Sequence, residues 1–231
     1  MCQTYFDVSK SSPAIEDYAK AIYALSVDGT GPVLNGEVAE RLGVTPATAT
    51  SMLKRLAGLG LVDYLPYKGV TLTPSGEKVA LEVIRHHRLI ESFLAEALGM
   101  PWDRVHDEAE VLEHYISEEL EERIATALGD PDRDPHGDPI PDRDLAITDP
   151  VPGVPLLELE IGSGGRFSRV SDGRPEMLRF LDDEGIRPGA GLRVLRREPF
   201  GGAVVVATDA GETPIGPDLA ARMLVVPEGP A

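Results

Sequence analysis

Residues 38–76 read VAERLGVTPATATSMLKRLAGLGLVDYLPYKGVTLTPSG, and this stretch decides the fold of the N-terminal part. Apolar residues at helical spacing predict a short helix over Leu34–Leu42, which Gly43 ends. A second helix is expected over Thr45–Leu59, with Thr45 as its N-cap and Pro46 at its first position. Two apolar runs, 61–65 and 70–73, flank the turn residues 66–69 and predict a hairpin. A helix-turn-helix followed by a hairpin is a winged helix.

A winged helix predicts a DNA-binding surface on its second helix. We expect the start of that helix to face base edges, and nearby basic side chains to face phosphates. The predicted DNA-binding residues are Thr45, Pro46, Ala47, Thr50, Ser51, Lys54, Arg55 and Lys68. The alternative is a plain helical hairpin packed in a core.

Helices flank the winged helix on both sides. Helical spacing of apolar residues predicts one helix over Ile15–Val27, with Ser12 as its cap, and a long helix over 75–98. Pro101-Trp102-Asp103 is expected to begin a further helix that continues to about Leu128.

The last two helices hold most of the residues that could bind a metal. His87 and Glu91 are four residues apart and share a helix face. His106, Glu110, Glu113 and His114 fall at i, i+4, i+7 and i+8 of the predicted helix and so also share one stripe. Imidazole and carboxylate together are ligands for Mn, Fe or Zn. The alternative is a solvated acidic face, and His86, one position off the stripe, is expected to have a packing or surface role.

The composition changes after residue 128. Pro, Asp and Gly dominate 129–155, which predicts an extended linker. Short apolar runs separated by Gly and Pro then predict a small β-barrel with one helix near Glu176–Asp182. The expected strands are Leu156–Ile161, Leu192–Leu195, Val204–Ala207 and Met223–Val226.

Charge is distributed unevenly along the chain, whose formal net charge is −17. Residues 1–74 carry six basic and seven acidic residues, residues 75–128 five and thirteen, and residues 129–231 eleven and nineteen. A DNA-binding chain of this kind needs its carboxylates neutralised, and divalent cations would do that. The single cysteine, Cys2, and the polar N-terminus favour a cytoplasmic protein, and no apolar stretch predicts a membrane span.

The order of these motifs resembles the diphtheria-toxin-repressor family of metal-dependent transcription regulators. The matching segments are 15–23, 38–42, 52–56, 60–62, 72–76, 87–91, 105–114, 136–141, 185–189 and 219–220. The resemblance implies a mostly α N-terminal winged helix and helical dimerisation domain, then a C-terminal small all-β SH3-like barrel. The implied domains are a DNA-binding domain (1–74), a metal-binding and dimerisation domain (75–130), a Pro-rich linker (131–155) and an SH3-like, FeoA-like domain (156–231).

The resemblance also implies about two metal sites per chain. The primary site would contain Asp17, Glu110, Glu113 and His114, and the second His87, Glu91 and His106. Iron-responsive members carry Met and Cys where this chain has Asp17 and Glu110, and manganese-responsive members carry acids. Hard carboxylates favour Mn²⁺ over softer metals, with Fe²⁺ as the alternative.

Two departures from the family pattern concern these sites. Lys20 stands where the smaller manganese-responsive members have an acidic residue, which argues against their closely paired metal centre. Gly165 and Ser168 stand where the SH3-like domain of iron-responsive members donates ligands. The SH3-like domain then donates a different ligand to the second site, such as Glu160, or donates none.

The sequence therefore predicts a Mn²⁺-dependent repressor of metal-uptake genes, a homodimer that binds a palindromic operator in double-stranded DNA and is not an enzyme. Three alternatives stay open. One is an Fe²⁺-dependent repressor of the same family, and one is a metal-independent, ligand-responsive winged-helix regulator. The third is a metalloenzyme using His106, Glu110 and His114 around Zn or Fe.

Overall fold

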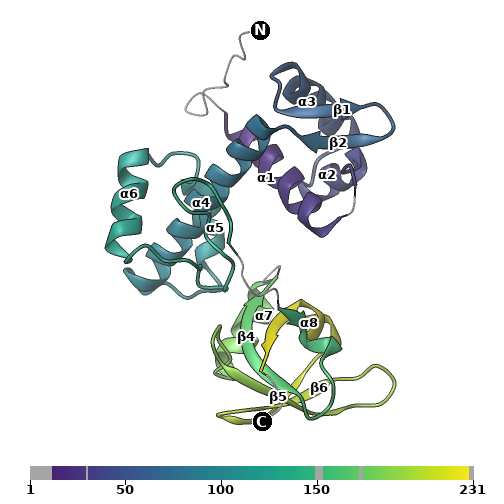
Figure 1. Ribbon diagram of the computed structural model, residues 1–231, viewed down its shortest axis with the longest axis vertical. Helices are drawn as coiled ribbons and strands as arrows, with labels where there is room; N and C mark the ends of the chain where they lie inside the picture. The colour runs from purple at the N-terminus through teal and green to yellow at the C-terminus, as the bar shows by residue number, and fades with distance from the viewer. Residues whose placement is uncertain (1–11, 30, 149–152, 172–173, 229–231) are drawn as a thin grey trace. The chain divides into compact units, whose positions relative to one another are not determined.

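The computed structural model describes residues 12–29, 31–148, 153–171 and 174–228 (Figure 1). The described chain forms two compact units. The first contains the residues up to His87 together with Val111–Ile116 and Pro141–Ala146. The second contains Arg88–Glu110, Ser117–Ile140 and the residues from Ile147 onward. No helix in the described ranges is long and apolar enough to cross a membrane.

The first unit is a winged helix. Its elements are α1 (Pro13–Asp28), α2 (Asn35–Arg41), α3 (Pro46–Gly58), β1 (Val62–Leu65), β2 (Gly69–Leu72) and the first part of α4 (Pro74–Glu96). The two strands pair antiparallel, with Val62 opposite Leu72. A buried apolar core joins α1 to the helix-turn-helix, and it includes Ile15, Ala19, Ile22, Val38, Ala49, Leu53, Leu56, Leu61 and Val70.

The turn between α2 and α3 has the predicted capping. The Thr45 hydroxyl accepts a hydrogen bond from the Thr48 amide at 3.2 Å, and Pro46 occupies the first turn of α3. Gly43 has φ +63, which a residue without a Cβ adopts without strain. At α1 the prediction is only half right, because Ser12 is at the N-cap position but its side chain makes no capping bond.

The long helix predicted after Pro101 is wrong as a single helix. The structure contains α5 (Val105–Leu112) and α6 (Glu118–Ala127) with a turn between them. Ser117 begins the second helix, since its hydroxyl accepts from the Leu120 amide at 3.3 Å. Glu113 and His114 therefore leave the helical stripe that contains His106 and Glu110.

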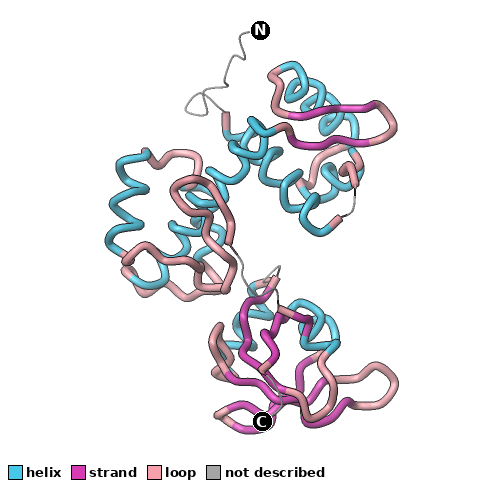
Figure 2. Tube along the Cα trace, viewed as in Figure 1, coloured by secondary structure: helices cyan, strands magenta, loops and turns pink. Residues whose placement is uncertain are grey.

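The C-terminal domain is built on a six-stranded antiparallel sheet in the order β3-β8-β4-β5-β6-β7, drawn in magenta in Figure 2. Its elements are β3 (Val154–Pro155), β4 (Gly164–Val170), α7 (Pro175–Asp183), β5 (Gly191–Arg197), β6 (Val204–Thr208), β7 (Gly211–Ile215), α8 (Pro217–Arg222) and β8 (Met223–Pro227). Three of the four predicted strands and the predicted helix are confirmed.

The strand predicted at Leu156–Ile161 is wrong. Residues Leu156–Glu158 form a turn of 3-10 helix. Leu156 and Leu159 are both buried, and a spacing of three places both on one side of such a turn. Both leucines join the core of the sheet domain, together with Phe167, Leu181 and Trp102.

Residues 131–141, predicted as part of an extended linker, form a compact loop. Arg133 and Pro139 are bridged across it, and Asp134, His136 and Ile140 are buried. The side-chain oxygen of Asp134 supplies hydrogen-bond acceptors inside the loop, so the segment does not need a neighbouring strand.

Gly76 is required where α4 begins beside the wing. A Cβ at this position would lie 1.9 Å from the Leu61 carbonyl oxygen. We expect Gly76→Ala to lower the free energy of unfolding by about 1–3 kcal/mol, because the helix must move off the wing. Chemical denaturation measures the change. Gly58→Ala is the matched control, since nothing lies within 4 Å of that Cβ and it should be neutral or stabilising. Equal stability of both variants would contradict this packing.

Candidate metal centres and DNA-binding surface

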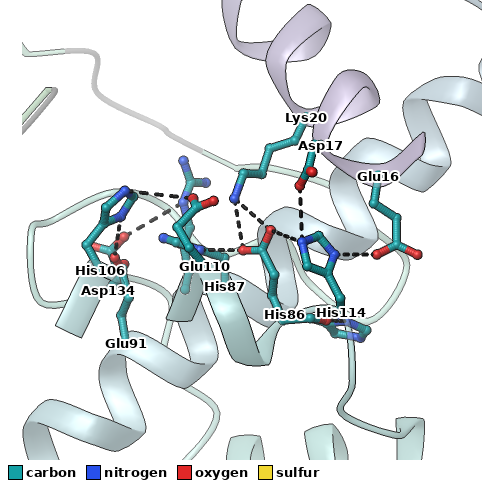
Figure 3. A network of polar contacts seen from close by, with 12 residues as sticks. Glu16, Asp17, Lys20, His86, His87, Glu91, His106, Glu110, His114 and Asp134 are labelled. Carbon is teal, nitrogen blue, oxygen red and sulfur yellow. Dashed lines mark hydrogen bonds and ion pairs between the residues drawn. The ribbon is translucent and has the colours of Figure 1, made fainter. Parts of the chain in front are cut away.

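His114 is the centre of a polar cluster in the first unit (Figure 3). Its Nδ1 lies 2.6 Å from Glu16 Oε2, and its Nε2 lies 3.1 Å from Asp17 Oδ1. Glu16 and Asp17 are neighbours in the first turns of α1, so both reach the same ring. A carboxylate on one imidazole nitrogen orients the other nitrogen toward a cation, as in metal-binding histidines.

Glu113 is the third carboxylate of this cluster, and its side chain is completely buried. Its oxygens lie 2.8 and 2.9 Å from Lys20 Nζ, and Oε2 lies 2.5 Å from His87 Nδ1. A buried carboxylate needs such partners, because an uncompensated charge in the protein interior is costly. Lys20 and His87 therefore hold Glu113 in place.

The residues present fit a divalent cation. Asp17, Glu113 and His114 each offer a ligand atom, and these atoms lie within 4.8 Å of one another. Two carboxylates and one imidazole suit Mn²⁺ or Fe²⁺, and the set has no sulfur atom. Three of the four predicted primary ligands thus lie together.

Glu110, the fourth predicted primary ligand, belongs to the second unit and pairs with His106 at 3.7 Å. His106 Nδ1 also lies 3.2 Å from Glu91 Oε1. Two of the three predicted second-site residues are therefore in contact. The third, His87, is one turn before Glu91 on α4. His86, excluded as a ligand, is buried with Nδ1 3.1 Å from the Glu113 carbonyl oxygen.

Two buried residues of the 131–141 loop, Asp134 and His136, were not among the predicted ligands. Burial, followed by the charges of Asp138 and Glu91, raises the pKa of Asp134 to about 7. Burial opposes ionisation of His136, but its hydrogen bond to Glu91 and the nearby carboxylates outweigh this and raise its pKa to about 9. Their signal in the sequence was the histidine within an Asp- and Pro-rich segment.

The predicted DNA-binding residues lie mostly on the exposed side of α3 and the wing. Thr45, Pro46, Ala47, Ser51, Lys54, Arg55 and Lys68 are exposed. Thr50 is only half-buried, and its hydroxyl accepts a hydrogen bond from Asn35, which also donates to the Tyr64 hydroxyl. This bond ties the start of α2 to α3 and the wing.

A winged helix with an exposed second helix, joined to clusters of imidazole and carboxylate, defines a DNA-binding protein with candidate metal centres. Residues 10–70 match the N-terminal DNA binding domain of the iron dependent repressors, and residues 73–142 match their metal binding and dimerisation domain. Residues 154–227 match the FeoA domain. The chain belongs to the iron-dependent repressor family, whose members are metal-dependent DNA-binding transcription regulators.

Known proteins are similar in sequence over most of the chain. The iron-dependent repressor IdeR of Mycobacterium tuberculosis is 33% identical over 202 residues, 83% of this chain and 87% of that protein. The diphtheria toxin repressor of Corynebacterium diphtheriae is 31% identical over 192 residues, 79% of this chain and 84% of that protein. A solved structure of a manganese-dependent transcriptional repressor in complex with manganese is 43% identical, covers 93% of this chain and all of its own, and has a TM-score of 0.85.

Lys20 competes with any cation that approaches Glu113. We expect Lys20→Met to raise the affinity for Mn²⁺ by about tenfold, since two unit charges 4 Å apart interact by on the order of 1–4 kcal/mol. The metal-free protein should melt at a lower temperature, because Glu113 loses a partner. Titration calorimetry and thermal unfolding with and without Mn²⁺ measure both effects. Lys78→Met, an exposed change on α4, is the control. If Lys20→Met leaves the affinity for Mn²⁺ unchanged or lowers it, Glu113 is not a ligand of the metal.

Proposed function

We propose that this chain is a Mn²⁺-dependent repressor of metal-uptake genes, with Fe²⁺ as the alternative activating metal. The observation that carries this proposal is the cluster of Asp17, Glu113 and His114 on the unit that contains the winged helix. Its donors are hard oxygens and one imidazole, which suit Mn²⁺. Family membership supports metal-dependent regulation without deciding between the two metals.

The relatives include both iron-dependent and manganese-dependent repressors. IdeR is an iron-dependent repressor, whereas the solved structure with the higher identity is a manganese-dependent one. The manganese regulator SloR is 30% identical, covers 94% of this chain and has a TM-score of 0.75. We base our preference for manganese on the ligand atoms of this chain, since Asp17 and Glu110 supply oxygen.

About two metal sites per chain are proposed. Asp17, Glu113 and His114 would hold the primary cation, with Glu110 as the fourth ligand that the family resemblance implies. His87, Glu91 and His106 would hold the second. A bound cation supplies positive charge that compensates the carboxylates and ties them together.

The primary ligands connect α1 to the residues that follow α5. Asp17 lies on α1, whose apolar face is part of the winged-helix core through Ile15, Ala19 and Ile22. Fixing Asp17 against Glu113 and His114 would therefore fix the helix on which the helix-turn-helix packs. A metal that binds this arrangement better than a looser one would act as corepressor.

A homodimer on a palindromic operator completes the proposal. Two winged helices placed one helical turn of DNA apart require an interface that sets their spacing. In the first unit, large apolar side chains at the end of α5 and just after it are exposed, and they support a dimer interface there. They are Val111, Leu112 and Tyr115. We place the protein in the cytoplasm, where its DNA is, and assign it no catalytic step.

The proposal is tested by the dependence of DNA binding on metal. Chelated protein is titrated with Mn²⁺ and, without oxygen, with Fe²⁺, and retention of a promoter fragment from a manganese transporter gene of the same genome is measured. We expect retention only with metal, at lower Mn²⁺ than Fe²⁺. Glu110→Ala, Glu113→Gln and His114→Ala should each lose the metal response, because each removes a proposed primary ligand. Glu119→Gln is a control on exposed α6.

Two outcomes would overturn parts of this proposal. If retention of the promoter fragment is the same with metal and with chelator, the metal-independent, ligand-responsive regulator is favoured. Retention that responds at lower Fe²⁺ than Mn²⁺ leaves the class intact and reverses the choice of metal.

The wing and α3 should contribute differently to DNA binding. Lys68 is exposed at the wing, so Lys68→Ala should weaken binding to all sequences alike and reduce the salt dependence by about one counterion. Ser51 is exposed on α3, and Ser51→Ala should change the preference among operator variants more than the salt dependence. Anisotropy titrations over a range of salt measure both, and an unchanged slope for Lys68→Ala would remove the wing from the interface.

A further inference from the structure

Three polar side chains form a hydrogen-bonded group where α2, α3 and the wing meet in the first unit. The side-chain nitrogen of Asn35 donates to the Thr50 hydroxyl oxygen at 3.0 Å and to the Tyr64 hydroxyl oxygen at 3.1 Å. Asn35 begins α2, Thr50 lies on α3 and Tyr64 lies on β1. All three residues are half-buried, so the group reaches the surface of the winged helix.

The direction of these two bonds leaves both hydroxyls as donors. An amide nitrogen carries two hydrogens and has no acceptor, so Asn35 occupies one lone pair on each hydroxyl oxygen. Each hydroxyl then keeps its own hydrogen for another partner. Within the described ranges of the chain, neither Thr50 nor Tyr64 donates that hydrogen to a protein group, although helical threonines often donate to the carbonyl four residues before them. The two hydroxyls are therefore available to a ligand that accepts hydrogen bonds.

Thr50 lies on the edge of α3 and not on its fully exposed face. Its bond to Asn35 places it on the side of α3 that faces α2, whereas Ala47 and Ser51 are exposed. Lys54 is also exposed and lies four residues after Thr50, so both share one edge of the helix. When a recognition helix enters the major groove, its edges face the phosphates on either side of the groove.

We propose that the Thr50 and Tyr64 hydroxyls, positioned by Asn35, bind one phosphate of the DNA backbone. The inference rests on the proposed function and assigns a phosphate contact to side chains without charge. Both hydroxyl oxygens lie within 3.1 Å of the same nitrogen, which is close enough for one phosphate group to accept from both. Thr50 then contacts the backbone, and the base edges are left to residues on the exposed face of α3.

A phosphate fits this pair of donors better than a base edge does. The two non-bridging oxygens of a phosphate only accept hydrogen bonds, whereas base edges in the major groove alternate donors and acceptors. Hydroxyl and amide side chains supply many phosphate contacts in protein–DNA complexes. Residues 1–74 contain only six basic residues against seven acidic ones, so this winged helix has few cations for the backbone. Neutral donors would supply contacts that the basic residues cannot.

A contact made by hydroxyls differs from a lysine contact in its dependence on salt. A lysine that neutralises a phosphate releases a counterion, so its contribution to affinity falls as salt is raised. A hydroxyl carries no charge and releases none. The contact at Thr50 and Tyr64 should therefore add affinity for all sequences alike without changing the slope of log affinity against log salt.

The test is DNA binding by the full chain with Mn²⁺, measured by anisotropy over a range of salt on the promoter fragment. Tyr64→Phe and Thr50→Val each remove one hydroxyl and keep the size of the side chain. We expect each to weaken binding by about tenfold, as for the loss of one hydrogen bond to a charged group, with the salt slope unchanged. Thr71→Val is the control, because it removes an exposed hydroxyl from the opposite face of the wing and should bind as the wild type does.

Methylphosphonate substitution, one linkage at a time, identifies the phosphate. It removes the charge and one acceptor oxygen of a single phosphate in the fragment. We expect a linkage at which it weakens binding of the wild type but not of Tyr64→Phe. Asn35→Asp should show the same loss of sensitivity, because a carboxylate accepts from both hydroxyls and turns them away from DNA. A purely structural role would lower the melting temperature of these variants and leave their sensitivity to every linkage as in the wild type.

The outcomes separate this contact from the proposed function. Equal affinity of Tyr64→Phe, Thr50→Val and the wild type would rule out the phosphate contact and leave metal-dependent DNA binding intact. Wild-type sensitivity to every linkage in both variants would rule it out as well. If the wild type does not bind the fragment with Mn²⁺ or with Fe²⁺, the proposed function and the phosphate contact are both wrong.

Discussion

The buried carboxylate of Glu113 is the constraint on which the first unit depends. Its side chain is inaccessible to solvent, so its charge must be compensated by protein groups or by a cation. Lys20 comes from α1 and His87 from α4, two elements that also form or adjoin the winged helix. Because Lys20 and His87 both contact Glu113, compensation of this one buried charge fixes α1 against α4. A cation bound at Glu113, as proposed, would replace Lys20 as the group that compensates this carboxylate.

Turn and helix-capping residues in the sequence made the winged helix predictable. Gly43, Thr45 and Pro46 mark a turn and a helix start by their own backbone chemistry, and the structure follows them. The break between α5 and α6 was less clearly marked, because residues 113–117 contain neither Gly nor Pro and Ser117 is the one capping residue among them. The chain turns there since Ser117 caps α6 and Glu113 is drawn into the interior, and only the second fact depends on tertiary structure.

The residue types of the candidate site were predictable, but residue spacing alone did not give their grouping. Helical spacing placed Glu110 with Glu113 and His114, yet α5 ends at Leu112 and the stripe ends with it. Glu16 was missed because a carboxylate that orients a histidine has no spacing signature. Asp134 and His136 were missed because Pro-rich composition indicates a linker, whereas one aspartate side chain satisfies the loop's own amides and lets it pack.

Binding of cations at the proposed sites would have a second effect on DNA affinity, through the distribution of charge along the chain. The segment 1–74, which contains the winged helix, is close to neutral, while 75–128 holds thirteen acidic and five basic residues. Carboxylates at a distance still repel phosphates, within a Debye length of about 8–10 Å at ordinary salt. Each divalent cation held by these carboxylates cancels two of their charges. Metal would then strengthen DNA binding both by fixing α1 and by lowering repulsion, and only the second effect would weaken as salt is raised.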